Sequence, residues 1–311
     1  MLGRAILVIK LGALGDFVQA LGPLAAIRHH HADQAITLLT TSPYAPLATA
    51  SGLVDQVHVD TRPRGFNFAK WRALRRFLRE GNFHRVYDLQ TSDRSSWYRR
   101  LFFPDQSPEW SGIAPGCSHP HANPNRDLMH TIERQREQLA VAGIDDVPSA
   151  DLSWVATDLS SFRLPERYAL LVPGGAPHRP AKRWPVARYR ELANWLSNNG
   201  IMPVVVGTRA EAMLAKEILD GTAQCIDLTG RTDIIDLAAL AGKAVCAIGN
   251  DTGPMHVTAV AGCPSIVLFS GDSDPKLCAP RGEQVSILCV PDLTALSEDK
   301  VISEIELFKA N

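Results

Sequence analysis

The chain has 311 residues, with 45% hydrophobic and 21% charged residues and a formal net charge of −1. This composition is typical of a globular protein with one large or two smaller domains, and it selects no particular partner. No apolar run approaches the roughly 20 residues that span a bilayer, and the N-terminal stretch MLGRAILVIKLG is too short for a secretory signal, so we expect a cytoplasmic protein.

In the first half of the chain, short apolar runs alternate with helix-like segments. The expected strands are AILVIK (5–10), AITLLTT (35–41), DQVHVD (55–60) and RVYDLQ (85–90). Helices are expected at 17–30, 68–80, 93–102 and 127–142. The weakly periodic segment 143–167 then interrupts the alternation, which indicates the end of a first domain and a linker.

The alternation resumes in the second half. The expected strands are YALLVP (168–173), MPVVVG (202–207), QCIDLTG (224–230), AVCAIG (244–249) and SIVLFSG (265–271). Helices are expected at 186–199, 209–220, 233–242 and 255–262. Strands that are apolar throughout and alternate with helices favour parallel sheets covered on both faces. The sequence therefore predicts two doubly wound α/β domains, 1–155 and 156–311, around a cleft where the strands end.

A glycine-spaced segment, KLGALGDFVQALGPL (10–24), follows the first expected strand. Gly12 and Gly15 permit tight backbone geometry and leave amide N–H groups exposed, and Asp16 opens the next helix. Asp16 can be a helix-capping carboxylate, or it can be a base at the cleft floor that the helix dipole keeps ionised. Because G-x-x-G-D differs from the dinucleotide motif G-x-G-x-x-G, a nicotinamide cofactor is not indicated.

A second glycine loop lies in VPGGAPHRPAKRWPVARY (172–189). Gly174 and Gly175 follow a strand, and Lys182 and Arg183 precede a helix. Glycine amides, a helix N-terminus and one or two cations can surround a phosphate, although the order of residues excludes a P-loop. The alternative is a solvated basic loop.

A third block, GNDTGPMHVTAVAGCP (249–264), joins two apolar strands. Asp251, Thr252 and Gly253 follow the first strand, and His256 lies in the first turns of the next helix. The backbone N–H groups of that turn and the Thr252 hydroxyl can donate to phosphate oxygens. A histidine near a helix start is usually structural, but a second anion loop in the same domain favours a ligand site.

The segment 60–100 carries eleven basic residues against four acidic ones. It can be a solvated helix face or a docking surface for an acidic substrate or an anionic membrane. Nucleic acid is not supported, since no helix-turn-helix, zinc or aromatic RNA-binding motif accompanies the charge. This segment and the first glycine loop give five candidate acceptor contacts: Gly15, Arg62, Arg64, Arg72 and Arg76.

Two features bear on metals. The six cysteines include no C-x-x-C pair, which favours reduced thiols over a disulfide framework or a zinc site. GDSDP (271–275) contains the D-x-D spacing that many metal-dependent sugar transferases use, but it follows a strong strand as a simple loop. We assign no metal to the chain.

Together these blocks resemble glycosyltransferase family 9, the lipopolysaccharide heptosyltransferase family. LGALGD, PGGAPHRPAKRWP and GNDTGPMHVTAVAGCPSIVLFSGDSDP occur in the family's order. The resemblance implies the GT-B fold, in which two Rossmann-like domains face a central cleft. The acceptor site then lies in 1–155 and the nucleotide-sugar site in 156–311, with a last helix that can return to the first domain.

The resemblance also implies residue roles. Asp16 falls on the family's catalytic base, Lys182 on its diphosphate-binding lysine, and Glu211 on an acidic residue that contacts the donor ribose. The full set of implied donor contacts is Gly174, Gly175, Lys182, Glu211, Asp251, Thr252, Gly253 and His256.

The implied activity is inverting, metal-independent transfer of a sugar, heptose from ADP-heptose in the usual case, to a lipopolysaccharide core or related glycan acceptor. The nucleotide sugar is a substrate, so no cofactor is expected. The implied partners are this donor, an anionic glycan or glycolipid acceptor and, peripherally, the inner face of the membrane. Two alternatives stay open. A GT-B-fold nucleotide-sugar epimerase would show no acceptor dependence, and a non-catalytic nucleotide-sugar-binding protein would tolerate loss of Asp16.

Overall fold

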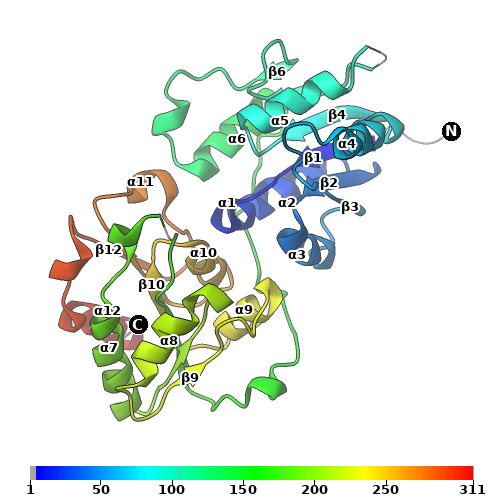
Figure 1. Cartoon of the computed structure of the whole chain (residues 1–311). Helices are drawn as coiled ribbons and strands as arrows, with labels where there is room; N and C mark the ends of the chain where they lie inside the picture. Colours follow the sequence, from blue (N-terminus) through cyan, green and yellow to red (C-terminus); the bar gives the residue numbers. More distant parts are fainter. Residues whose placement is uncertain (1–4, 105, 177, 311) are drawn as a thin grey trace. The chain divides into compact units, whose positions relative to one another are not determined.

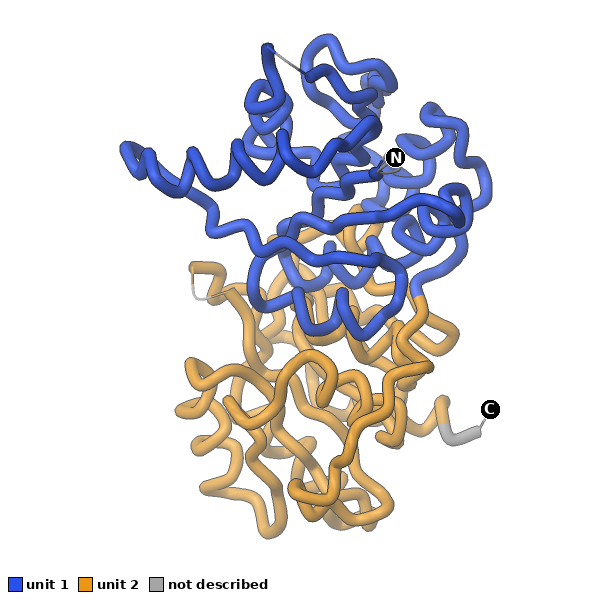
Figure 2. Tube along the Cα trace, turned by 90° about the vertical axis from the view of Figure 1, so that its right-hand side faces the viewer, with its two compact units in different colours: residues 1–150 blue, residues 151–311 orange. Residues whose placement is uncertain are grey.

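The computed structural model describes residues 5–104, 106–176 and 178–310. The chain divides into two compact units between Ala150 and Asp151 (Figure 2). The boundary predicted from the sequence, 155/156, lies in the same weakly periodic segment. Each unit has its own sheet and its own buried apolar cluster.

In the described part of the first unit, six parallel strands form one sheet in the order β3-β2-β1-β4-β5-β6 (Figure 1). The strands are β1 Ala5–Ile9, β2 Ile36–Thr40, β3 Gln56–Val59, β4 Phe83–Asp88, β5 Glu109–Gly112 and β6 His119–Pro120. The α-helices are α1 Leu14–Gln19, α2 Leu21–His30, α3 Ala45–Ala50, α4 Phe68–Glu80, α5 Asp93–Tyr98 and α6 Thr131–Val141. From Ile6 to Ile9, β1 is inaccessible to solvent, as expected for a parallel strand with helices on both faces.

The described part of the second unit repeats this plan, with six parallel strands in the order β12-β11-β10-β7-β8-β9. The strands are β7 Tyr168–Val172, β8 Met202–Val205, β9 Ile226–Asp227, β10 Cys246–Asn250, β11 Ser265–Phe269 and β12 Val285–Cys289. The α-helices are α7 Val186–Asn198, α8 Ala212–Leu219, α9 Ile234–Ala241, α10 Gly253–Val260, α11 Pro275–Cys278 and α12 Glu298–Ala310. Strands β7, β10 and β11 are buried along their whole length.

Both sheets have the doubly wound order of a Rossmann fold. The chain moves outward from β1 to β3 and then returns to place β4 on the other side of β1, and β7 and β10 are related in the same way. Ligands of open α/β sheets bind outside the carboxyl ends of the strands at this point of reversal. In this chain the ends of β1 and β4, and separately those of β7 and β10, are therefore the places for a ligand.

The nine strands expected from apolar runs all occur, with ends shifted by up to three residues. Strands β5, β6 and β12 were not expected. Strands β5 and β6 are short and partly polar, and β12 lies at a sheet edge, where only Leu288 is buried. The segment 17–30, expected as one helix, forms two helices that meet at Ala20, and the first of them begins three residues earlier.

The C-terminal helix α12 places Val301 and Ile305 in the core of the second unit, where it packs against α7 and β11. Its buried face is therefore committed to that unit. Among the residues that the structure describes, no helix is both long and apolar enough to cross a bilayer.

Candidate functional site

The carboxyl ends of β1 and β4 are tied together at the switch point of the first unit. The Lys10 ammonium group donates a hydrogen bond to the carbonyl oxygen of Leu89 at 3.0 Å, and the Leu11 amide donates to Oε1 of Gln90 at 2.7 Å. Two neighbouring strand ends are thus fixed before the glycine loop begins.

The glycine loop brings Asp16 to this edge of the sheet. Helix α1 starts at Leu14 with Ala13 as its N-cap residue and with no side-chain cap, so Asp16 is the third helical residue. The interpretation of Asp16 as the capping carboxylate is therefore wrong. Its side chain is partly exposed and lines two cavities of about 770 and 180 Å³.

The wider cavity lies over the glycine loop. Gly12 has φ +119°, and a Cβ atom there would lie 2.6 Å from the Tyr44 ring, so only glycine allows this approach. The Arg62 guanidinium lines the same cavity and donates to the carbonyl oxygen of Leu11 at 2.7 Å. A carboxylate, a phenol and a guanidinium thus share one cavity.

The smaller cavity is strongly basic. Lys10, Arg126 and Arg134 line it together with Asp16. Lys10 is 3% exposed, and its burial lowers the pKa of its ammonium group, an effect that the negative charges of Asp16 and Asp88 oppose. Burial and the neighbouring Arg134 lower the pKa of Arg126, but an arginine stays charged at any physiological pH.

Asp88 lies at the end of β4, behind this cavity, and is inaccessible to solvent. Its Oδ1 accepts hydrogen bonds from the amides of Gln90 and Thr91 at 3.2 and 3.0 Å. Its Oδ2 is buried and has no hydrogen-bond partner among the described residues. Burial raises the pKa of Asp88 to about 6, although the positive charge of Lys10 acts in the opposite direction.

In the second unit, Asn250 connects the two strand ends at the switch point. Its amide group donates to the carbonyl oxygens of Pro173 and Gly174 at 2.9 and 3.0 Å, just beyond β7. Its Oδ1 accepts from the backbone N–H of Trp184 at 2.9 Å and from the Tyr189 hydroxyl at 3.1 Å. One buried side chain therefore holds the Gly174 loop and the Lys182–Trp184 segment together.

Lys182 and Asp251 form an ion pair at the end of β10. The ammonium nitrogen lies 2.6 Å from Oδ2 of Asp251, and the two side chains are 12% and 9% exposed. The Ser273 hydroxyl donates to the same carboxylate oxygen at 2.7 Å. This arrangement fixes the position of the lysine nitrogen and leaves two of its three hydrogens for another acceptor.

Helix α10 begins directly after this pair. Thr252 is its N-cap residue, and Gly253 and a proline occupy the first turn. The Thr252 hydroxyl is buried and has no hydrogen-bond partner within the described ranges. His256 is 7% exposed, on the second turn. The unsatisfied amides of a helix N-terminus favour an anion, and here a hydroxyl and a lysine lie beside them.

The second glycine loop packs closely against its neighbours. A Cβ atom on Gly174 would lie 2.9 Å from the Glu211 side chain, and one on Gly175 would lie 3.3 Å from that of Arg183. Glu211 follows β8 and accepts hydrogen bonds from the backbone amide and the hydroxyl of Thr208. In Rossmann folds an acidic residue after the second strand binds the ribose hydroxyls, and β8 is the second strand of this unit.

The structure gives no support for a metal at the D-x-D spacing. Asp274 caps the short helix α11 by accepting from the backbone N–H of Lys276 at 2.9 Å. Among the described residues, no group of three or more histidine, cysteine, aspartate or glutamate side chains is arranged to hold a metal ion.

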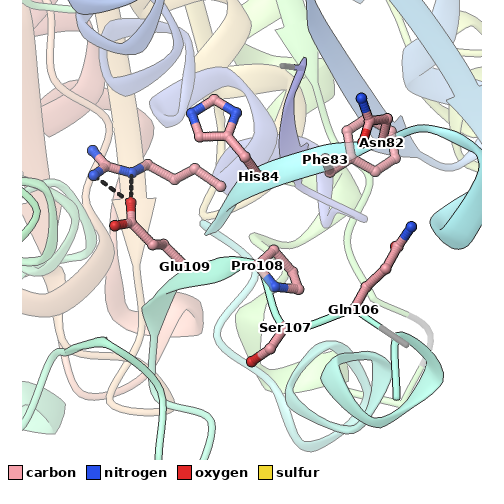
Figure 3. Close-up of a pocket in the computed structure, with 8 residues that line it drawn as sticks. Asn82, Phe83, His84, Gln106, Ser107, Pro108 and Glu109 are labelled. Carbon is pink, nitrogen blue, oxygen red and sulfur yellow. Dashed lines mark hydrogen bonds and ion pairs between the residues drawn. The ribbon is translucent and has the colours of Figure 1, made fainter. Parts of the chain in front are cut away.

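A further pocket, of about 550 Å³, lies at the amino ends of β4 and β5 (Figure 3). Phe83 and Glu109 line it, and the Arg85 guanidinium donates to Glu109 at 2.7 Å. This pocket lies at the amino ends of the strands, whereas Asp16 lies near their carboxyl ends. The charges of Arg85 and Glu109 neutralise each other.

Of the predicted acceptor contacts, Arg62 shares a cavity with Asp16, and Gly15 is buried within α1. Arg64, Arg72 and Arg76 are exposed on the loop before α4 and on α4 itself, and they are not among the described residues that line the two Asp16 cavities. As acceptor contacts these three arginines stay a prediction.

Sequence reasoning missed the three cations of the smaller cavity, Lys10, Arg126 and Arg134. A lysine that ends a buried strand beside a glycine loop was a usable signal for Lys10. Arg126 and Arg134 lie on either side of the start of α6, outside the basic segment 60–100. No local sequence pattern distinguishes them from solvated arginines.

These features define a class of protein. Two Rossmann-type units, one with an anion-binding turn at its switch point and the other with a carboxylate beside a basic cavity, are typical of GT-B enzymes that use nucleotide sugars. The model of glycosyltransferase family 9 (heptosyltransferase) matches residues 71–306, and the chain belongs to this family.

Individual relatives agree with this family. A lipooligosaccharide heptosyltransferase 2 from Haemophilus ducreyi is 32% identical over 124 residues, which cover 38% of this chain and 36% of that protein. The chain thus matches about a third of the length of this curated relative.

Solved structures share the fold over nearly the whole chain. A glycosyltransferase family 9 protein from Veillonella parvula has a TM-score of 0.86 and 20% identity, and covers 98% of this chain and 97% of its own. The E. coli heptosyltransferase WaaC with ADP-2-deoxy-2-fluoro heptose has a TM-score of 0.78 and 22% identity, and covers 98% of this chain and 99% of its own. The fold is therefore GT-B, as the family resemblance implied.

Proposed function

We propose that this protein is an inverting, metal-independent glycosyltransferase that moves a sugar, heptose from ADP-heptose, to an anionic acceptor of the lipopolysaccharide core type. The observation that carries the proposal is the convergence of Lys182, the Thr252 hydroxyl and the N-terminus of α10 at one strand end. The E. coli relative of the same fold was solved with an ADP-heptose analogue, which supports this choice of donor.

The donor diphosphate fits the second unit by charge. The ammonium group of Lys182 and the backbone amides at the start of α10 offer positive charge and hydrogen-bond donors in fixed positions. As the glycosidic bond breaks, negative charge grows on the leaving diphosphate. Donors that are already oriented stabilise that charge without reorganisation, so a divalent cation is not needed.

Glu211 and His256 complete the donor site in this proposal. Glu211 lies against Gly174 and stands where a Rossmann acidic residue binds the ribose hydroxyls. His256 is buried on α10, one turn beyond the amides that face the diphosphate. We expect Glu211 to bind the ribose hydroxyls of the donor, and His256 to support the turn.

Asp16 serves as the general base. Its carboxylate takes the proton of the acceptor hydroxyl while the oxygen of that hydroxyl attacks the anomeric carbon on the face opposite the diphosphate. The C–O bond to the diphosphate breaks in the same displacement, so the configuration inverts. Lys10 and Arg126 line the cavity beside Asp16, so the base and two cations face the same space.

The acceptor side fits an anion for the same reason. Three cations, Lys10, Arg126 and Arg134, surround a cavity that holds the single carboxylate of Asp16. A sugar acid or a phosphorylated sugar places its negative group among these cations and its hydroxyl toward Asp16. Core oligosaccharides are built from such sugars and are anchored in a membrane, so we place the enzyme in the cytoplasm with peripheral contact to the inner face of the inner membrane.

A donor and acceptor panel tests the proposal. The wild type should transfer a sugar to isolated core acceptors, as detected by mass spectrometry, and turnover should survive excess EDTA. Asp16→Asn should retain ADP affinity and lose about 10²–10⁴ in turnover, the usual contribution of a general base.

Three results would contradict the proposal. Turnover of Asp16→Asn within threefold of wild type would remove the assigned base. Loss of activity in EDTA with rescue by Mg²⁺ or Mn²⁺ would return the D-x-D loop to consideration. Donor consumption without any acceptor would instead favour the epimerase.

A further inference from the structure

Exposed aromatic side chains are concentrated on one part of the first unit. Phe66 is 89% exposed and Phe68 is 73% exposed, and their ring centroids lie 6.1 Å apart. Large aromatic surface in contact with water is unfavourable by roughly 25 cal/mol per Å² of apolar area. Two neighbouring, almost fully exposed phenylalanines therefore indicate a binding surface rather than chance.

The loop that carries these rings is held in place. The indole N–H of Trp71 donates to the carbonyl oxygen of Gly65 at 3.2 Å, and Arg94 donates to that of Pro63 at 3.1 Å. Asn67 caps α4 by accepting from the backbone N–H of Lys70. Both ends of the loop are thus fixed to α4 and α5, and the two rings are presented from a defined position.

The surface around the rings is basic. The segments 61–80 and 93–104 contain ten basic residues against two acidic ones. The exposed basic side chains of these segments include Arg64, Lys70, Arg72, Arg76 and Arg100.

The apolar and the basic side chains of α4 lie on different sides of the helix. Leu74 and Leu78 are buried in the core of the unit, so its cations remain on the outer side. Trp97, which is 40% exposed on α5, packs edge-on against Trp71 at 4.8 Å between ring centroids. Helices α4 and α5 are therefore in contact through Trp71 and Trp97, and aromatic and cationic side chains lie next to each other there.

We propose that Phe66 and Phe68 insert into the headgroup region of an anionic bilayer, while the cations of α4 bind the lipid phosphates around them. Aromatic rings favour the membrane–water interface, and each lysine or arginine near an anionic leaflet adds attraction. A soluble acidic protein would also cover rings and cations, because protein interfaces are rich in aromatic residues. The lipid surface is favoured because the acceptor in the proposed function is anchored in a membrane.

This inference deepens the proposed function, since it specifies how an enzyme with a membrane-anchored acceptor reaches it. It concerns binding to lipid rather than turnover, so the two proposals can fail separately. Absence of sugar transfer with every donor would leave the binding of vesicles unaffected.

Vesicle cosedimentation with the full chain tests the inference. Wild type should bind phosphatidylcholine vesicles that contain about one third phosphatidylglycerol, more weakly at high salt, and should bind pure phosphatidylcholine poorly. The variant Phe66→Ser/Phe68→Ser should bind the anionic vesicles about tenfold or more weakly, because it loses the inserted apolar area. Arg72→Gln/Arg76→Gln should lose about tenfold or more, and on anionic vesicles only.

Matched controls come from the second unit. Met213→Ser/Leu307→Ser removes two apolar side chains that are 74% and 56% exposed, and Lys216→Gln/Lys243→Gln removes two exposed charges. Both controls should bind vesicles like the wild type. Thermal unfolding of every variant confirms that it is folded, and the serine variant should be as stable as wild type because the two rings contact little of the protein.

Unchanged binding of Phe66→Ser/Phe68→Ser to anionic vesicles overturns the inference. If this variant also loses turnover on a water-soluble, lipid-free acceptor, the two rings belong to the acceptor site instead.

Discussion

Removal of the Lys182 ammonium group is the sharpest test of the donor site. Lys182→Met keeps most of the aliphatic chain and deletes the charge that lies 2.6 Å from Asp251. If Lys182 binds the diphosphate, this variant should lose affinity for ADP. If Lys182 only neutralises Asp251, the variant should lose stability and keep its affinity.

The expected magnitudes follow from the geometry. A charge-assisted hydrogen bond contributes about 1.5–3 kcal/mol, which corresponds to about a 10- to 150-fold rise in the Kd for ADP. Breaking a fully buried ion pair costs about 3–5 kcal/mol. Here the side chains are 12% and 9% exposed and Ser273 still donates to Asp251, so we expect a loss of about 1–3 kcal/mol in the free energy of unfolding.

A double-mutant cycle separates the two effects. Asp251→Asn added to Lys182→Met removes both charges and should restore part of the stability, but it should not restore ADP affinity, because the cation is still absent. Calorimetric titration with ADP and urea unfolding measure the two quantities. Lys243→Met, which deletes an exposed lysine at the amino end of β10, is the control and should change neither. An ADP Kd of Lys182→Met within about twofold of wild type, or its recovery in the double variant, would refute the reasoning.

Two further predictions concern the first unit. Arg126→Gln/Arg134→Gln should raise the acceptor KM by about tenfold or more, because it removes two of the three cations in the cavity beside Asp16, and it should leave the affinity for ADP unchanged. Steady-state kinetics measure the KM and calorimetry measures the affinity. Loss of ADP binding in a folded variant would contradict this prediction. Burial raises the pKa of Asp88 to about 6 in the folded chain, above about 3.9 in an unfolded chain, so the folded state binds the carboxyl proton more tightly. The stability that this proton gives to the folded state is fully present below about pH 4 and is lost as the pH rises through about 6. In Asp88→Asn, the free energy of unfolding should therefore change less between pH 4 and 7 than in the wild type, by up to about 3 kcal/mol. An unchanged pH profile in urea unfolding would show that Asp88 titrates normally.

Much of the fold was predictable because a buried strand has a recognisable local pattern of apolar residues. Strands such as 168–172 and 265–269 are almost entirely apolar and buried at every position, as a parallel strand covered on both faces requires. The edge strand β12 lacks this pattern, since most of its residues are only partly buried, and it was not predicted from the sequence. Strand β9, also at an edge, was expected over seven residues and spans only Ile226–Asp227.

The candidate donor residues follow a local sequence pattern for a related reason, and their role stays a prediction. Glycines, a lysine and a helix start must occur in a fixed order along the chain to form an anion-binding turn, and that order is visible in 172–189 and 249–264. The position of Asp16 in its helix was harder to predict, because α1 starts three residues earlier than expected and Asp16 is its third residue rather than its cap. A boundary error of that size is enough to exchange one physical role for another.

The sequence by itself determined the alternation of strands and helices, the two-domain plan and the chemical types present at each strand end. Only the tertiary structure decided which of those ends are neighbours. Lys182 and Asp251 are 69 residues apart, and Lys10 and Leu89 are 79 apart, yet each pair is in hydrogen-bond contact. The reason is that β1 pairs with β4 and β7 with β10 across long crossovers, so the contacts depend on how whole strands order themselves in the sheet. The basic cavity exists only because α6 and the segment before it bring Arg134 and Arg126 beside Lys10 and the end of β4, and no local sequence pattern indicates this packing.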